Sequence, residues 1–259
     1  MKIGISYNLF DGEELLENSI QSIRDNVDYI SVVYQEFSNF GNPCNKELVP
    51  LLKKLKNEGL IDELYRYRPQ PLKGGHYNEI TKRNIGLFLS EGQKCTHHMA
   101  MDSDEFYTAE QFKFMKATMK EGDYDSAACQ MTTYYKKPIY RLDPKEEYYV
   151  SLLYKIRRGN QYVLGLYFPV LVDPTRRIEP GRCKVFARDE IEMHHMSYVR
   201  KDINKKLYNS SAKVNFEQWI PEFLEYFENW DDSKKALMPG KPPGEYNTKK
   251  VKNIFNISI

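Results

Sequence analysis

Apolar runs of strand length alternate with amphipathic segments in the first hundred residues, and this alternation restricts the fold more than any other feature. Residues 3–9 and 29–34 have the β-branched and aromatic character of strands, and 64–67 predicts a shorter third strand. A helix after Gly12 separates the first two strands, and a helix over 48–59 precedes the third. This order predicts right-handed crossovers and a mainly parallel sheet with helices on both faces.

The alternation continues once more before the pattern changes. A helix is expected over 77–90, with Lys82, Arg83 and Asn84 near its middle, and an apolar strand follows over 96–101. After a helix from about 109 to 119, strand-like runs dominate, at 126–135, 148–156, 161–172 and 190–199.

These patterns predict an α/β fold with one main domain and a C-terminal extension. The main domain covers residues 1–200 and divides into a first half, 1–125, and a β-rich second half, 126–200. Residues 201–259 are expected to form a helical extension that packs on the same domain, with a breaker-rich link at 239–244.

Charge and cysteine content exclude several classes of protein. The 259 residues carry a formal net charge of +2, so binding to long nucleic acid is not expected. The four cysteines lie far apart without a CxxC pair, which argues against a zinc ribbon or a redox motif and fits a reducing compartment. No stretch resembles a signal peptide or a membrane span. We therefore expect a soluble, cytoplasmic protein.

An acidic stretch follows the apolar run at 96–101. If the strand continues through it, Asp102 and Asp104 point the same way, because side chains alternate along a strand, while Glu105 points to the other side. Two carboxylates of this kind are suitable ligands for Mg²⁺ or Mn²⁺. The alternative is a solvated turn, or acidic residues that favour the start of the next helix.

A pair of histidines near the end of the β-rich half is the second informative stretch. Imidazole is a common ligand of divalent metals, and strand alternation allows only one of His194 and His195 to face a given site. The alternative is a structural pair, with one ring packed and the other hydrogen-bonded. His97 and His98 are expected to be core or sheet residues.

Four landmarks taken together resemble a known family. They are Tyr7 with Asn8, residues 82–87, residues 101–105 and residues 195–200. Their order and spacing are similar to those of GT-A glycosyltransferases, near the family 2 type. The resemblance covers residues 1–200 and implies a Rossmann-like GT-A fold and a nucleotide-diphosphate sugar as the donor.

The resemblance implies a role for each matching residue. Asp104 would bind Mn²⁺ or Mg²⁺ directly together with His195, and Asp102 would lie near the ribose or a water of the metal shell. The other donor-binding residues would be Tyr7 and Asn8 by the base, Arg83 and Asn84 by the ribose or phosphates, and Arg200 by the diphosphate or the following loop. Gln35 stands where the family usually has an acidic pair that reads the base, which leaves the base open between UDP and GDP types.

An inverting transfer also requires a carboxylate that accepts the proton of the acceptor hydroxyl. The candidates are Asp143, Asp173 and Glu179, and Asp173 is favoured because it ends an apolar run at a Pro-marked turn. A retaining transfer would not need this base. The neighbouring basic residues form either a solvated face or a grip on an anion: Arg176, Arg177, Arg182 and Lys184.

We therefore predict a metal-dependent, inverting glycosyltransferase of the kind used in polysaccharide biosynthesis. The expected partners are a nucleotide-sugar donor and a saccharide, glycoconjugate or lipid-linked glycan acceptor. Contact with a membrane is expected to be peripheral at most, through the basic tail at 249–252. The alternatives are a sugar-phosphate nucleotidyltransferase, which usually has a Gly-rich loop after its first strand, and a non-catalytic glycan-binding module.

Overall fold

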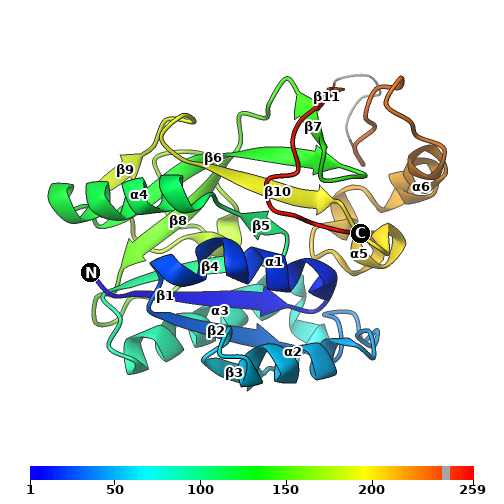
Figure 1. Ribbon diagram of the computed structural model, residues 1–259. Coiled ribbons are helices and arrows are strands. Elements are labelled where there is room, and N and C mark those ends of the chain that lie inside the picture. Colours follow the sequence, from blue (N-terminus) through cyan, green and yellow to red (C-terminus); the bar gives the residue numbers. More distant parts are fainter. Residues whose placement is uncertain (241–245) are drawn as a thin grey trace.

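The computed structural model describes residues 1–240 and 246–259, and its strands join in one curled, mixed sheet (Figure 1). The strand order is β11-β7-β6-β8-β4-β1-β2-β3, and β5, β9 and β10 attach beside this path. The strands are β1 Ile3–Leu9, β2 Tyr29–Tyr34, β3 Glu63–Arg66, β4 His97–Asp102, β5 Glu105–Phe106, β6 Ser126–Tyr135, β7 Tyr140–Asp143, β8 Tyr149–Lys155, β9 Cys183–Val185, β10 Glu192–Tyr198 and β11 Asn247–Lys250.

The first half of the chain has the predicted parallel arrangement. Strands β3, β2, β1 and β4 are parallel neighbours, joined through the helices α1 Glu13–Ile23, α2 Leu48–Asn57 and α3 Gly75–Gly92. Alternate residues of β1, among them Ile3 and Ile5, enter the main core with α1, α2 and α4 (Ala109–Gly122). The predicted α/β class with helices on both faces is confirmed.

Helix α3 covers the opposite face of β1 at very short range. A Cβ on Gly86 would lie 2.1 Å from the hydroxyl oxygen of Ser6, and a Cβ on Gly4 would lie 2.5 Å from that of Ser90. Glycine therefore stands on both sides of this contact because no other side chain fits. The close approach brings Lys82 and Arg83, about one turn before Gly86, to the edge of the sheet.

The second half of the sheet departs from the parallel pattern. Strand β8 is antiparallel to both β4 and β6, and β7 is antiparallel to β6 and β11. The predicted strand at 161–172 is wrong, because this segment has no regular secondary structure. Gly159 and Gly165 take positive φ angles within and beside it, which interrupts the alternation that a strand requires.

Strand β10 connects the acidic motif with the histidine pair. It runs parallel to β6 and also pairs with the short β5, where His195 lies opposite Glu105. The backbone N–H of Met196 donates a 2.7 Å hydrogen bond to the carbonyl oxygen of Asp104. Two segments about ninety residues apart in the sequence are thereby held side by side.

The helices after residue 200 pack against β6 and β7. Helices α5 Ile203–Asn209 and α6 Ile220–Glu228 form an apolar cluster with Tyr135 and Leu142 of β6 and β7. The expected basic tail instead contains β11, after which Phe255 contacts Phe106 and His194 (red trace in Figure 1). The predicted link at 239–244 lies largely outside the described residues. No helix in the described ranges is long and apolar enough to cross a membrane.

Candidate functional site

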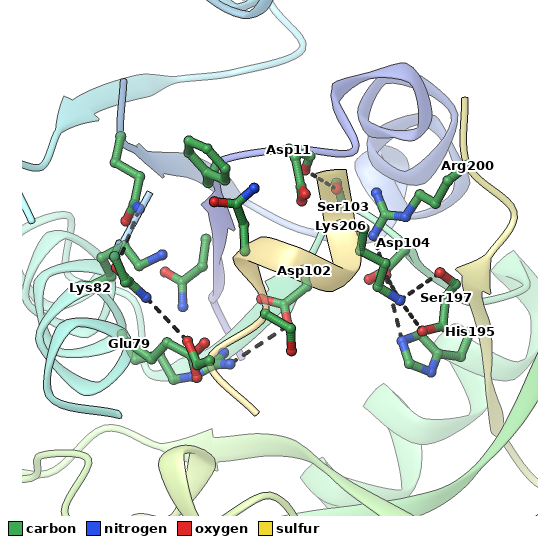
Figure 2. A pocket seen from close by; sticks show the side chains of 18 residues that line it. Asp11, Glu79, Lys82, Asp102, Ser103, Asp104, His195, Ser197, Arg200 and Lys206 are labelled. Carbon is green, nitrogen blue, oxygen red and sulfur yellow. Dashed lines mark hydrogen bonds and ion pairs between the residues drawn. The ribbon is translucent and has the colours of Figure 1, made fainter. Parts of the chain in front are cut away.

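A polar cavity of about 280 Å³ lies at the carboxyl ends of β1, β2 and β4 (Figure 2). Ligands of parallel α/β sheets bind at this edge. The lining comes from these strand ends, from α3, from β10 and from the region of α5: Asn8, Phe10, Asp11, Gln35, Asn39, Glu79, Lys82, Arg83, Asp102, Ser103, Asp104, His195, Ser197, Arg200, Lys206, Asn209, Ser210 and Ser211.

Asp104 lies on the wall that β5 and β10 build together. Its Oδ2 accepts a 2.5 Å hydrogen bond from Nη2 of Arg200 and lies 3.6 Å from Nε2 of His195. The ammonium nitrogen of Lys206 is 4.0 Å from the same oxygen. Burial acts to raise the pKa of Asp104, but Arg200, His195 and Lys206 together hold it well below its ordinary value. Asp104 is therefore a carboxylate at neutral pH.

Gly12 determines where the Arg200 side chain can lie. Gly12 has a φ of 75°, and a Cβ at this position would lie 1.5 Å from Nη1 of Arg200. The guanidinium group thus occupies space that only glycine leaves open, and its side chain is 5% exposed. Its Nε and Nη1 have no hydrogen-bond partner within the described part of the chain.

The residues present fit a divalent cation as a site with two protein ligands. Among the described residues no three His, Cys, Asp or Glu side chains are placed to share one ion. Asp104 and His195 nevertheless bring a carboxylate oxygen and an imidazole nitrogen within 3.6 Å of each other. Mg²⁺ and Mn²⁺ often take few protein ligands and complete their shell with water and phosphate oxygens. A carboxylate has enough lone pairs to bind Arg200 and an ion together.

Asp102 belongs to a different group of charges. Its Oδ2 accepts a 2.5 Å hydrogen bond from Arg176 and lies 3.7 Å from Nη2 of Arg83. Burial would raise the pKa of Asp102, but Arg176 and Arg83 lower it below its ordinary value. Glu105, which strand alternation placed on the other side from Asp102, is buried against the same Arg176. Asp102 is therefore not a third ligand beside Asp104 in this arrangement.

The polar groups nearest β2 have unpaired atoms. Both side-chain polar atoms of Asn8 and the Oε1 of Gln35 are buried without a partner in the described residues. The amide nitrogen of Gln35 donates to the carbonyl oxygen of Phe37 at 2.7 Å. Because β2, β1 and β4 are neighbours in this order, these groups lie on the opposite side of Asp102 from His195.

Two residues that were expected to bind the nucleotide point away from the first cavity. Tyr7 is fully buried, and its hydroxyl lies 3.0 Å from that of Ser19, because neighbours on a strand point to opposite faces and Asn8 takes the cavity side. Asn84 bonds the backbone of Tyr162 through its Oδ1 and Nδ2, at 2.7 and 3.1 Å. It follows Arg83 by one position on α3 and therefore turns away from the cavity. Neither residue lines it.

A second cavity, of about 510 Å³, adjoins the first and shares Glu79, Arg83, Asp102 and His195 with it. Asp173 lies on its wall. The Oδ1 of Asp173 accepts from the backbone N–H and the hydroxyl of Thr175, at 2.7 and 2.8 Å, where it begins the short 3₁₀ turn Pro174–Arg176. Its Oδ2 lies 4.0 Å from Arg83.

The other two carboxylates considered as the base do not reach the cavities. Glu179 and Asp143 are exposed and line neither of the two cavities. The basic stretch after Asp173 is not one anion-binding face. Arg176 turns inward to Glu105 and Asp102, and Arg177 donates to backbone carbonyl groups.

Several cavity residues were not anticipated from the sequence. Lys206 and Ser197 lie beside Asp104, and Asp11 lies next to Ser103, whose hydroxyl donates to the Asp11 carbonyl oxygen at 3.4 Å (Figure 2). Burial raises the pKa of Asp11, and Arg200 and Lys206 oppose this. The sequence signal for Lys206 was weak, because it is one of many lysines and its helix of seven residues begins after the last recognisable landmark.

Solved structures are similar to this chain in fold. TarS from S. aureus, residues 1–349, aligns over 88% of this chain and 72% of its own, with 14% identity and a TM-score of 0.49. GalNAc-T7, crystallised with UDP, GalNAc and Mn²⁺, aligns over 88% of this chain and 49% of its own, with 12% identity and a TM-score of 0.48. Both are GT-A-type glycosyltransferases.

The similarity is one of fold. At these identities and TM-scores it does not assign roles to individual residues. No protein-family model matches the sequence, and no curated protein matches it.

Proposed function

We propose that this chain is a glycosyltransferase that moves a sugar from a nucleotide-diphosphate sugar, of UDP or GDP type, to a hydroxyl group of a saccharide or glycoconjugate, with inversion. The observation that carries the proposal is one cavity with unpaired atoms of Asn8 and Gln35 on one side and the Asp104–His195 pair on the other. The first side suits a nucleoside, which needs hydrogen bonds, and the second suits a diphosphate, which needs positive charge.

Asp104 and His195 are the residues that would hold Mn²⁺ or Mg²⁺. A bound ion would supply positive charge to the diphosphate as the glycosidic bond breaks. Arg200 keeps Asp104 ionised and in place through its 2.5 Å hydrogen bond. Asp102, with a side chain 37% exposed between the nucleoside side and His195, is available to accept a hydrogen bond from the ribose.

Asp173 is the candidate base for the acceptor hydroxyl. Thr175 holds its Oδ1, and its Oδ2 lies on the wall of the second cavity, 3.9 Å from Nε of Arg176 and 4.0 Å from Nη2 of Arg83. In the transfer, the acceptor oxygen bonds to the anomeric carbon and the bond to the phosphate oxygen breaks. The hydroxyl proton passes to Asp173. The shared wall of the two cavities supports a donor in the first and an acceptor in the second.

No observation favours either alternative function. The turn after β1, where a nucleotidyltransferase usually has its Gly-rich phosphate loop, is filled by the Arg200 side chain at Gly12. A binding module without catalysis would not require a carboxylate, an imidazole and several cations to converge on one cavity.

The test is calorimetric titration of UDP and GDP with and without Mn²⁺, using the wild type and Asp104→Asn. We expect one nucleotide to bind more tightly with Mn²⁺, and this gain to disappear in Asp104→Asn. Asp25→Asn is the matched control, because Asp25 is exposed and lines neither cavity. Failure of the wild type to bind either nucleotide would contradict the proposal.

A further inference from the structure

Lys206 is a cation on the wall of the first cavity that the proposed function does not yet use. It projects from α5 beside Asp104 and Ser197 (Figure 2). Its Nζ donates to the carbonyl oxygen of Ser197 at 2.5 Å and also to the Ser197 hydroxyl. The aliphatic part is packed so that the ammonium group lies 5.1 Å from the centre of the Tyr198 ring, and 20% of the side chain is exposed.

Lys206 differs from the two arginines of the cavity in its partners. Arg200 donates directly to the carboxylate of Asp104 at 2.5 Å, and Arg83 lies 3.7 Å from that of Asp102. Within the described residues, the two hydrogen bonds of Lys206 go to uncharged oxygen atoms. Its nearest carboxylate, that of Asp104, is 4.0 Å away and already bound by Arg200. An ammonium group has three donors, so one is available for a ligand.

The ammonium group of Lys206 is largely removed from water, because its side chain is only 20% exposed and lies against Ser197 and Tyr198. A group in this situation gains stability from an anion beside it, because the anion compensates for the lost hydration of the ammonium group. The Lys206 wall of the cavity is therefore suited to bind an anion.

The charge of a bound diphosphate would favour a cation on this wall. A nucleoside diphosphate released by transfer carries roughly three negative charges, and an ion at Asp104 and His195 would compensate two of them. Arg200 and Arg83 are each paired with a carboxylate. Lys206 lies on the same wall as Asp104, and its ion pair with that carboxylate is long, at 4.0 Å, without a hydrogen bond between the two groups.

We propose that Lys206 is a further catalytic residue, which binds the β-phosphate of the donor and stabilises the diphosphate as it leaves. This rests on the proposed function. When the bond between the anomeric carbon and the phosphate oxygen breaks, the electron pair stays on that oxygen and increases the negative charge near Lys206. Lys206 donates a hydrogen bond and keeps its proton, while Ser197 holds the ammonium group in position.

The experiment compares nucleoside diphosphates with monophosphates. UDP and UMP, and likewise GDP and GMP, are titrated into the wild type and Lys206→Met, with Mn²⁺ and with EDTA. Methionine has a similar length and can keep the contact with Tyr198 while the charge is lost. We expect diphosphate affinity to fall roughly 10- to 100-fold, as for the loss of a hydrogen bond to a charged group, and monophosphate affinity to stay unchanged.

Two further variants separate charge from folding. Lys206→Arg keeps the charge and should restore most of the diphosphate affinity. Lys201→Met removes an exposed lysine that lies nearby but outside the first cavity, and it should leave the affinities for diphosphate and monophosphate unchanged. Thermal unfolding of each variant identifies any loss of folded protein.

The outcomes distinguish this inference from the function on which it rests. If the wild type binds a diphosphate and Lys206→Met binds it equally well, the role of Lys206 is wrong and the glycosyltransferase proposal stands. Equal losses for diphosphate and monophosphate would also overturn it, because they indicate a structural role. If the wild type binds no nucleotide, the proposed function fails first.

Discussion

Replacement of Gly12 by alanine tests how the fold builds the phosphate side of the site. The new Cβ would lie 1.5 Å from Nη1 of Arg200 and 2.8 Å from the Ser103 hydroxyl, so Arg200 must move away. Its hydrogen bond to Asp104 joins side chains that are only 5% and 7% exposed. The substitution therefore acts on Asp104 without touching it.

The expected magnitude has two parts. Alanine at a φ of 75° costs about 1–2 kcal/mol. Breaking a buried ion pair costs about 3–5 kcal/mol, and the lower end applies because His195 and Lys206 still compensate Asp104 in part. Gly12→Ala should therefore lower the free energy of unfolding by about 4–5 kcal/mol.

Gly59→Ala is the matched control. Gly59 has nearly the same backbone angle, a φ of 76°, but no atom lies within 4 Å of its Cβ position. Gly59→Ala should therefore lower the free energy of unfolding only by the cost of the backbone conformation, about 1–2 kcal/mol. Urea unfolding at pH 7 measures both variants, and a diphosphate titration with Mn²⁺ should show weaker binding for Gly12→Ala alone. Equal stabilities and equal affinities would refute the reasoning, because Arg200 could then leave Asp104 without consequence.

Three further predictions concern other parts of the chain. Arg176→Met should destabilise the fold by about 3–5 kcal/mol by leaving buried Glu105 without its partner, and adding Glu105→Gln should recover much of this in urea unfolding. Asp173→Asn should lower kcat for transfer while nucleotide affinity stays the same. As the control, Glu179→Gln should alter neither kcat nor nucleotide affinity. An unchanged kcat in Asp173→Asn would exclude Asp173 as the base. Burial lowers the pKa of His98 to about 3 in the folded protein, below its value of about 6.5 in the unfolded chain. Because the unfolded chain then binds the proton first, the free energy of unfolding decreases as pH falls below about 6.5. Between pH 7 and pH 5 the wild type should therefore lose about 2 kcal/mol more than His98→Phe, and parallel losses would contradict this.

Much of the fold was predictable because it depends on local periodicity. The strands β1, β2 and β6 have the predicted bounds, and the helices α3 and α4 differ from prediction mainly at their ends. The buried face of α3 does not follow the hydrophobicity of its residues, since Phe88 is 70% exposed while Lys82 and Arg83 are buried. A charged residue enters a core only when the fold provides partners there, and periodicity does not show those partners.

The second half was less predictable because its pairing is not local. The short strands β5, β7, β9 and β11 have too few residues to produce a pattern of their own. They exist because a neighbouring strand offers hydrogen bonds, as when β11 pairs with β7 from the other side of a long stretch of chain. Their positions follow from the sheet as a whole.

The sequence by itself determined the α/β class and placed the acidic motif at the end of a strand, and it indicated His195 as a candidate metal ligand. The tertiary structure decided which neighbours face the cavity, with Asn8 inside and Tyr7 in the core. It also decided the partners of each charge: Arg200 and Lys206 lie beside Asp104, and Arg176 lies between Asp102 and Glu105. The reason is physical: strand periodicity depends on residues two positions apart, whereas the electrostatics of a buried carboxylate depends on side chains from distant segments.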